Sequence, residues 1–192
     1  MRQFYDHLLR SNDAEKQLRY LAIFNRRPLP KIDSEIIALL DSPETKVRRA
    51  TVIALSITAS PIIREIAIKL LNREEDELRE YAFALLINNY KEGDNSKIEL
   101  ALTRFTEKKH LHCAGISLKE IAENSKDTAL APALLFLVVN GPDPFCREDF
   151  LEILLKWQKC PEAILYEAQW DFYKRVLPFY CIFSAKSNQP SA

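Results

Sequence analysis

Apolar residues recur three or four positions apart along most of the chain, and turn-forming residues separate these stretches. Residues at this spacing share one face of a helix, so the pattern predicts amphipathic helices and little else. Prolines, capping residues and the turns "NREED", "EGDN" and "NGPDP" set the boundaries. A first helix is predicted from the Asn12–Glu15 capping box through Ala22. Further helices are predicted over residues 33–40, 47–59, 61–71, 77–91, 96–106, 109–123, 129–139, 145–157 and 161–183. Because no segment alternates with period two, the predicted fold class is all-α.

The stretch "DSPETKVRRATVIAL" at residues 41–55 has an echo 31 residues later, where "VRRATVIAL" aligns with "LREYAFALL". Arg48 aligns with Arg79 in this comparison. A third, degenerate copy begins at Lys109 with "KHLHCAGIS" and lacks the Val-Arg pair. Each copy follows a shorter predicted helix and a tight turn. A helix pair that repeats every 20 to 50 residues is typical of an α-solenoid.

This stretch resembles a HEAT-like repeat, in which an acidic, proline-containing turn precedes Val-Arg and then small residues. Arg79 carries the second match, although the turn "REEDE" before it contains no proline. The resemblance is good over residues 33–91 and weak over 96–123. It implies a short right-handed α-solenoid of antiparallel helix pairs, with Arg48 and Arg79 bonding loop acids or carbonyls between repeats. Such repeats serve mostly as binding scaffolds, so the resemblance indicates fold more than function.

The predicted organisation is one all-α domain over residues 1–183, followed by a disordered tail at 184–192. Within this domain we expect an N-terminal helix region at 1–30, repeats at 33–140 and aromatic-rich C-terminal helices at 144–183. Ten aromatic residues lie between Phe145 and Phe183. Burying such rings favours a cap over the open end of the array. The alternative is that they supply hot-spot side chains to a partner.

The candidate partner-binding face lies on the second helix of each predicted helix pair. It is the side opposite the apolar residues, here called the core stripe, that are expected to face the core. Counted from Val47 at about 100° per residue, positions 2, 5, 6 and 9 point away from that stripe. They are mostly apolar or small, whereas an exposed amphipathic helix is polar there. Either other elements cover this face, or it lines an apolar groove that accepts a partner. The candidate partner-binding residues are Arg49, Val52, Ile53, Ser56, Glu80, Phe83, Ile87 and Leu118. Ala84, Leu111, Ala114 and Gly115 complete the face.

Composition narrows the function classes. The chain of 192 residues is 47% apolar and 28% charged, which is typical of a globular protein. Lys+Arg and Asp+Glu balance at 27 each, which argues against a dedicated polyanion binder. The three glycines are dispersed, so neither a P-loop nor a dinucleotide fold is expected.

Asp6 and His7 interrupt the N-terminus where a signal peptide needs an apolar run. The longest apolar run, Ala129–Val139, is shorter than the about 20 residues that span a bilayer. We therefore expect a cytoplasmic protein without a membrane span.

Candidate chemistry is sparse. In "HLHC", His110 and Cys113 share a helix face but His112 does not, and a structural zinc site takes four ligands. We therefore expect no metal and no cofactor. The acids at 74–77 are interpreted as solvated caps of a helix N-terminus, and nothing indicates a Cys-His hydrolase, so no enzymatic activity is expected. Without a CxxC motif, four cysteines are interpreted as reduced core thiols: Cys113, Cys146, Cys160 and Cys181.

The predicted function is a non-enzymatic protein-binding scaffold or adaptor that uses the inner face of a HEAT-like array. The expected partner is another protein, either an amphipathic helix or a toxin domain. One alternative is a stoichiometric inhibitor such as an immunity protein for a toxin. Another is a nucleic-acid-binding HEAT-like protein, since some proteins of that kind are DNA glycosylases and basic clusters occur at residues 26–27, 46–49 and 108–110. Interleaved acids and the lack of a motif for a flipped base argue against nucleic acid.

Overall fold

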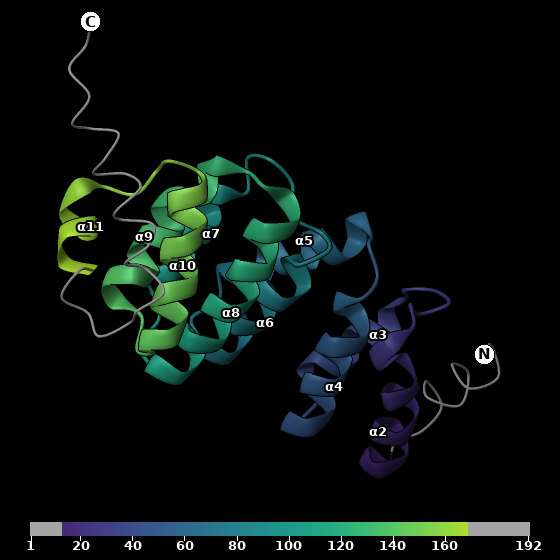
Figure 1. The fold of residues 1–192 in the computed structure, drawn as a ribbon. Coiled ribbons are helices and arrows are strands. Elements are labelled where there is room, and N and C mark those ends of the chain that lie inside the picture. The colour runs from purple at the N-terminus through teal and green to yellow at the C-terminus, as the bar shows by residue number, and fades with distance from the viewer. Residues whose placement is uncertain (1–12, 169–192) are drawn as a thin grey trace, which may run out of the picture.

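The computed structural model describes residues 13–168, and over this range every regular element is a helix (Figure 1). The α-helices are α2 (Ala14–Ile23), α3 (Ser34–Ala38), α4 (Thr45–Ser56), α5 (Pro61–Leu71), α6 (Asp76–Leu86), α7 (Asn95–Leu102), α8 (Lys108–Ser125), α9 (Ala131–Asn140), α10 (Pro144–Lys156) and α11 (Glu162–Ala168). Short 3-10 segments are η1 (Phe24–Arg26), η2 (Leu39–Asp41) and η3 (Thr128–Leu130). The all-α prediction is confirmed for the described residues. Within them, every helix is too short or too polar to cross a bilayer.

Capping side chains begin several helices where the sequence predicts them. The Ser60 hydroxyl accepts a hydrogen bond from the Ile62 amide, and Pro61 occupies the first turn of α5. Asp143 accepts from the Phe145 amide at the start of α10 in the same way. The start of the first described helix differs from the prediction. The sequence predicts a capping box formed by Asn12 and Glu15, whereas the side chain that caps α2 is Asp13. Likewise, α7 begins at Asn95 after Asp94, and not at the predicted Ser96–Glu99 box.

Helix α6 ends at Leu86, although the apolar period predicts a helix through Lys91. The reason is the buried side chain of Asn89, which bonds the last turn of α6 and the loop between α4 and α5. Its amide nitrogen donates to the carbonyls of Leu85 and Thr58, and its oxygen accepts from the Ser60 amide. This side chain therefore ties the end of α6 to the loop before α5.

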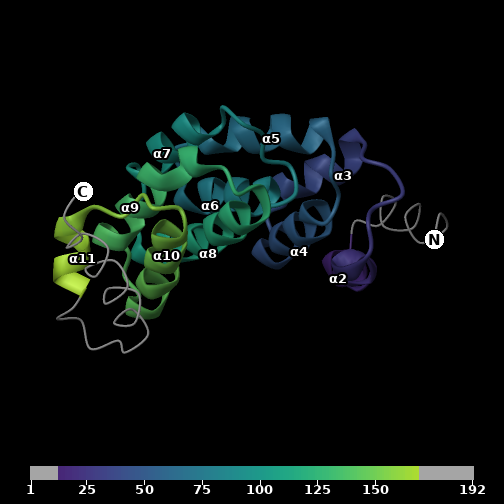
Figure 2. The ribbon, with the colours of Figure 1, turned by 45° about the horizontal axis from the view of Figure 1, so that its top comes forward.

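The helices form two rows with the apolar core between them (Figures 1 and 2). Helices α2, α4, α6, α8 and α10 are successive neighbours in one row. Helices α5, α7 and α9 are successive neighbours in the other, where α5 packs on α6 and α9 packs on α10. Figure 2 shows α3, α5 and α7 along one edge of the molecule and α4, α6 and α8 along the opposite edge.

Leu, Ile, Ala and Phe side chains fill the space between the rows. Phe24, Phe83 and Phe150 are among the largest fully buried side chains. Gly115 lets α8 pack tightly against α9 and α10, because a Cβ there would lie 3.2 Å from Phe150 Cζ and 3.4 Å from a Leu137 methyl. A larger side chain at this position would force the helices apart.

The aromatic C-terminal segment is described only as far as Ala168. Phe150 is buried and Trp157 packs against the core, whereas Phe145 and Tyr166 are exposed. The other six aromatic residues of this segment, the predicted helix beyond Ala168 and the predicted tail at 184–192 lie outside the described residues. The prediction that this segment caps the array therefore stays a prediction.

Candidate functional site

Three of the predicted partner-binding residues lie in the core. Val52 is 4% exposed, and Phe83 and Leu118 are fully buried. A helix inside a row contacts a neighbour on each flank as well as the other row beneath it. Positions that a single helical wheel assigns to the open side are therefore buried against α4, α6 or α8. The groove interpretation does not hold for these three residues, and its alternative, a covered face, does.

The same holds for Leu111, Ala114 and Gly115, which are buried on α8. The other predicted residues remain at least partly accessible. Arg49 and Ile53 are exposed on α4, and the Ile53 side chain retains 46% of its accessible area. Ser56, Glu80, Ala84 and Ile87 are partly buried.

The accessible residues lie together across three adjacent helices. Helix α6 packs against α4 on one side and α8 on the other, and Arg49, Glu80 and Cys113 lie on these three helices. One turn further along each helix come Ile53, Ala84 and the 43% exposed Ile116. We call this surface the α4–α6–α8 face and define it by Arg49, Ile53, Glu80, Ala84, Ile87, Cys113 and Ile116.

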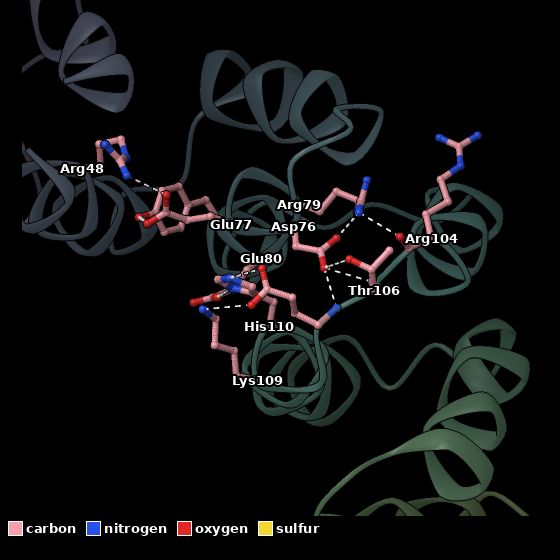
Figure 3. A network of polar contacts seen from close by, with 11 residues as sticks. Arg48, Asp76, Glu77, Arg79, Glu80, Arg104, Thr106, Lys109 and His110 are labelled. Atoms are coloured by element: carbon pink, nitrogen blue, oxygen red, sulfur yellow. Dashed lines mark hydrogen bonds and ion pairs between the residues drawn. The ribbon is translucent and has the colours of Figure 1, made fainter. Parts of the chain in front are cut away.

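Arg48 joins two of these helices (Figure 3). One guanidinium nitrogen donates to the carbonyls of Ser42 and Pro43, at 2.8 and 3.2 Å. The other donates to Glu77 Oε2 at 2.6 Å. Burial disfavours the charged form of Glu77, but hydrogen bonds from Tyr81 and Arg48 outweigh it and hold the pKa of this carboxyl below its ordinary value. As predicted, Arg48 bonds loop carbonyls and an acid, and the acid lies on another helix, α6.

Arg79 repeats the same arrangement one step along the chain. Its guanidinium donates to the carbonyl of Arg73, six residues earlier, as Arg48 does to Ser42. It also pairs with Asp76 and donates to the Arg104 carbonyl at 2.8 Å. The predicted structural role of Arg79 is likewise confirmed.

Asp76 connects α6 to the chain that enters α8, a role that the sequence did not indicate. Its Oδ2 accepts hydrogen bonds from the Thr106 amide, the Thr106 hydroxyl and the Glu107 amide at 2.9, 2.8 and 2.7 Å. Burial opposes its ionisation, but these bonds and the Arg79 guanidinium hold its pKa below the ordinary value. Figure 3 shows the carboxylate between Arg79 and Thr106.

The Glu80 side chain is held in place from α8. Its Oε2 lies 2.5 Å from His110 Nδ1, and the His110 ring is buried. The Glu80 carboxylate is therefore already bonded within the protein. The other side chains at the centre of the α4–α6–α8 face, Ala84 and Ile87, are apolar.

A signal for these pairs was present in the sequence. Arg48–Glu77, Asp76–Thr106, Glu80–His110 and Lys119–Asp149 join residues 29 or 30 positions apart, which is close to the 31-residue spacing predicted from the sequence. Ser60–Asn89 and Arg64–Asp94 have the same separations. A search for opposite charges or hydrogen-bonding side chains at one repeat length would have found them.

Two described cysteines lie close to charged or ionisable side chains, and Cys146 Sγ is 3.7 Å from His112 Nδ1. Burial, followed by the charges of Asp143 and Asp149, raises the pKa of the Cys146 thiol above its ordinary value. Burial and Glu80 raise the pKa of Cys113. A raised pKa lowers the fraction of each thiol that is ionised near neutral pH.

Much of the basic charge is matched by acids. Besides the Arg48–Glu77 pair, Lys109 pairs with Glu107 at 3.0 Å and Arg64 with Asp94 at 2.5 Å. Such pairing lowers the positive potential that a phosphate backbone requires.

No protein-family model, curated protein or solved structure matches this chain. The functional argument therefore depends on the residues of the chain itself.

Proposed function

We propose that this chain is a short HEAT-like α-solenoid of antiparallel helix pairs that acts without catalysis by binding another protein. The order of neighbours in the two rows supports the repeat arrangement. The equivalent bonds of Arg48 and Arg79, and the side-chain bonds at 29 or 30 residues, support a 31-residue repeat independently of apolar spacing. In such arrays the surface formed by successive repeats is the usual binding surface.

One observation carries the choice of surface: the outward side of α6 carries partly buried apolar side chains beside Glu80, between two exposed isoleucines. Ala84 and Ile87 are partly buried there, and the more exposed Ile53 and Ile116 flank them on the neighbouring helices. In the other row, the outward side of α5 differs, because the 47% exposed Ile62 is accompanied by exposed charged residues such as Glu65 and Lys69.

The α4–α6–α8 face suits the apolar side of an amphipathic helix. An apolar centre with flanking isoleucines accepts side chains that recur every third or fourth residue of a bound helix. Arg49 at its edge and exposed on α4 would attract an acidic residue of that helix. We infer a partner helix that is apolar on one side and acidic at the border.

The test compares two isoleucines of nearly equal exposure. Ile53→Asp places a charge on the α4–α6–α8 face, and Ile62→Asp places the same charge on α5 in the other row. The tagged full-length chain and both variants are used to capture partners from the native host, with far-ultraviolet circular dichroism confirming that each variant is folded. We expect Ile53→Asp to lose a protein that the wild type and Ile62→Asp both retain.

Two outcomes would count against the proposal. Equal retention of the partner by both variants would place the binding surface elsewhere. Recovery of nucleic acid with no stable protein partner would overturn the protein-binding function itself. A stoichiometric inhibitor is a special case of the same function, recognised if the captured protein is an enzyme that loses activity at a one-to-one ratio.

A further inference from the structure

The start of α10 brings three metal-ligand side chains together beside α8, at a place that does not belong to the α4–α6–α8 face. His112 comes from the first turns of α8, Asp143 caps α10, and Cys146 lies in the first turn of α10. His112 Nδ1 lies 3.7 Å from Cys146 Sγ and 3.8 Å from Asp143 Oδ2. One ligand atom from each residue lies within 4.8 Å of the other two.

These separations are close to those of a tetrahedral zinc centre. Zinc lies about 2.0–2.1 Å from imidazole nitrogen, about 2.3 Å from thiolate sulfur and about 2.0–2.2 Å from carboxylate oxygen. With tetrahedral angles, those bond lengths place the ligand atoms about 3.3–3.6 Å apart. The two distances from His112 Nδ1, 3.7 and 3.8 Å, exceed this by a few tenths of an ångström, and the ligand atoms of Asp143 and Cys146 lie within 4.8 Å of each other. Side-chain rotations would bring the three atoms to bonding distance of one ion.

The local structure already orients the carboxylate. Asp143 Oδ1 accepts the Phe145 amide proton at 2.9 Å, which leaves Oδ2 directed toward His112. A ligand held by a second hydrogen bond loses less freedom when it binds a metal. The cap of α10 therefore also positions a ligand.

Charge around the cluster favours a cation. Asp143 contributes one negative charge directly, and Asp149 acts on Cys146 from the next turn of α10. Lys119, whose positive charge also acts on Cys146, donates to Asp149 Oδ2 at 2.7 Å, so its charge is already matched. A divalent ion placed between His112, Asp143 and Cys146 would replace repulsion between carboxylate and thiolate by attraction to both.

The ligand types select the metal. An imidazole and a thiolate are soft or borderline donors that suit zinc, whereas magnesium and calcium take oxygen ligands. The cluster is about one-third exposed at His112 and Asp143, which leaves room for a water molecule. Three protein ligands and a water are the usual arrangement of a zinc site with an open position.

We propose that His112, Asp143 and Cys146 bind one zinc ion per chain, with water in the fourth position. The sequence pattern "HLHC" drew attention to a metal site formed by neighbouring residues of one helix. We expected no metal because this pattern supplies fewer than the four ligands of a structural zinc site. In the structure, one residue of that pattern, His112, lies beside two further candidate ligands from the start of α10, Asp143 and Cys146. A bound ion would link α8 to α10, and this proposal is independent of partner binding.

The experiment uses the full-length chain after chelator treatment and removal of any polyhistidine tag. Zinc titration by calorimetry gives the stoichiometry and affinity, and cobalt in place of zinc reports thiolate ligation through its charge-transfer absorption. We expect one ion per chain, and a cobalt spectrum of tetrahedral type with a sulfur charge-transfer band. Thermal melting should move to higher temperature with zinc, because the ion binds the folded state.

Variants separate the proposed ligands from other residues. Cys146→Ser, His112→Gln and Asp143→Asn should each weaken zinc binding by at least about 100-fold, more than loss of an outer-shell contact usually does. Asparagine also caps helices well, so Asp143→Asn removes the charge and keeps the helix start. Cys113→Ser is the matched control, because Cys113 is also partly buried on α8 and has a raised pKa. It should leave zinc affinity unchanged.

Two results would overturn this proposal. The first is the absence of stoichiometric zinc binding by the folded wild-type chain. The second is zinc binding that Cys146→Ser and Asp143→Asn leave unchanged while both variants retain the wild-type circular dichroism spectrum. Circular dichroism and the melting temperature without metal establish that each variant is folded before its affinity is compared.

Discussion

Replacing Asp76 by alanine tests whether the side-chain bonds between α6 and the chain that enters α8 stabilise this fold. The Asp76 side chain is 5% exposed and pairs with the 4% exposed Arg79. Its other oxygen accepts three hydrogen bonds from the chain that enters α8, at 2.7 to 2.9 Å. Asp76→Ala removes all of these contacts at once and leaves the Arg79 guanidinium without its carboxylate.

The expected loss follows from the burial of the pair. Removing one partner of a buried ion pair typically costs about 3–5 kcal/mol, since the other charge stays buried. Arg79 keeps its bonds to the carbonyls of Arg73 and Arg104, which offset part of this penalty. We therefore expect Asp76→Ala to lower the free energy of unfolding by about 3 kcal/mol, at the lower end of that range. Against a usual total of about 5–15 kcal/mol, this is a large fraction.

The assay is urea denaturation followed by far-ultraviolet circular dichroism, with the free energy taken from linear extrapolation. Glu75→Ala is the control, because Glu75 is an exposed neighbour whose ion-pair partner, Arg73, is exposed as well. We expect that variant to unfold like the wild type. If Asp76→Ala costs less than about 1 kcal/mol, the contribution of one ordinary hydrogen bond, the argument is refuted.

The same variant predicts a pH dependence. The folded pKa of Asp76 lies below its ordinary value, because the bonds from Glu107 and Thr106 outweigh the cost of burial. Its stabilisation is therefore fully present above the unfolded aspartate pKa of about 3.9 and is lost as the pH falls through the lower folded pKa. The difference in unfolding free energy between the wild type and Asp76→Ala should shrink as the pH falls below about 4. A constant difference down to the acid transition would contradict this account.

Three further predictions concern other positions. Burial and the hydrogen bond to Glu77 raise the pKa of Tyr81 to about 12, so ultraviolet titration should show a late-ionising tyrosine that Tyr81→Phe removes. Its contribution to stability is present below the unfolded pKa of about 10 and is lost as the pH rises toward the folded value. Gly115→Leu should lower the free energy of unfolding by about 1–3 kcal/mol or more, because the Phe150 ring already lies at contact distance, and an unchanged melting temperature would contradict that packing. Phe83→Asp, which the sequence-based groove interpretation expects to fold, should instead fail to fold, and a native circular dichroism spectrum would place Phe83 at the surface.

The predicted helices agree with the structure where a local signal is strong. Ser60 with Pro61, and Asp143 before α10, mark helix starts because a capping side chain bonds amides only two or three residues away. The end of α6 was missed because its cause, the Asn89 side chain, bonds a loop about 30 residues earlier in the chain. A local pattern contains no information about such a partner.

The candidate face was predicted only in part, for a related reason. A helical wheel correctly separates Val47 from Ile53, since one is fully buried and the other is about half exposed. It assigns Val52, Phe83 and Leu118 to the open side because it treats each helix as if it packed on one side only. In a row, both flanks of a helix are covered, so the accessible strip is narrower than the wheel predicts.

The sequence alone determined the helical fold class, most helix starts and the structural role of Arg48 and Arg79, because these depend on residues a few positions apart or on one repeat period. The tertiary structure decided which outward residues stay accessible, how Asp76 connects α6 to α8, and that His112 lies beside Asp143 and Cys146. Each of these depends on the packing of one helix against another. Packing sets distances between residues that are far apart in the chain, and apolar periodicity within a single helix does not specify them.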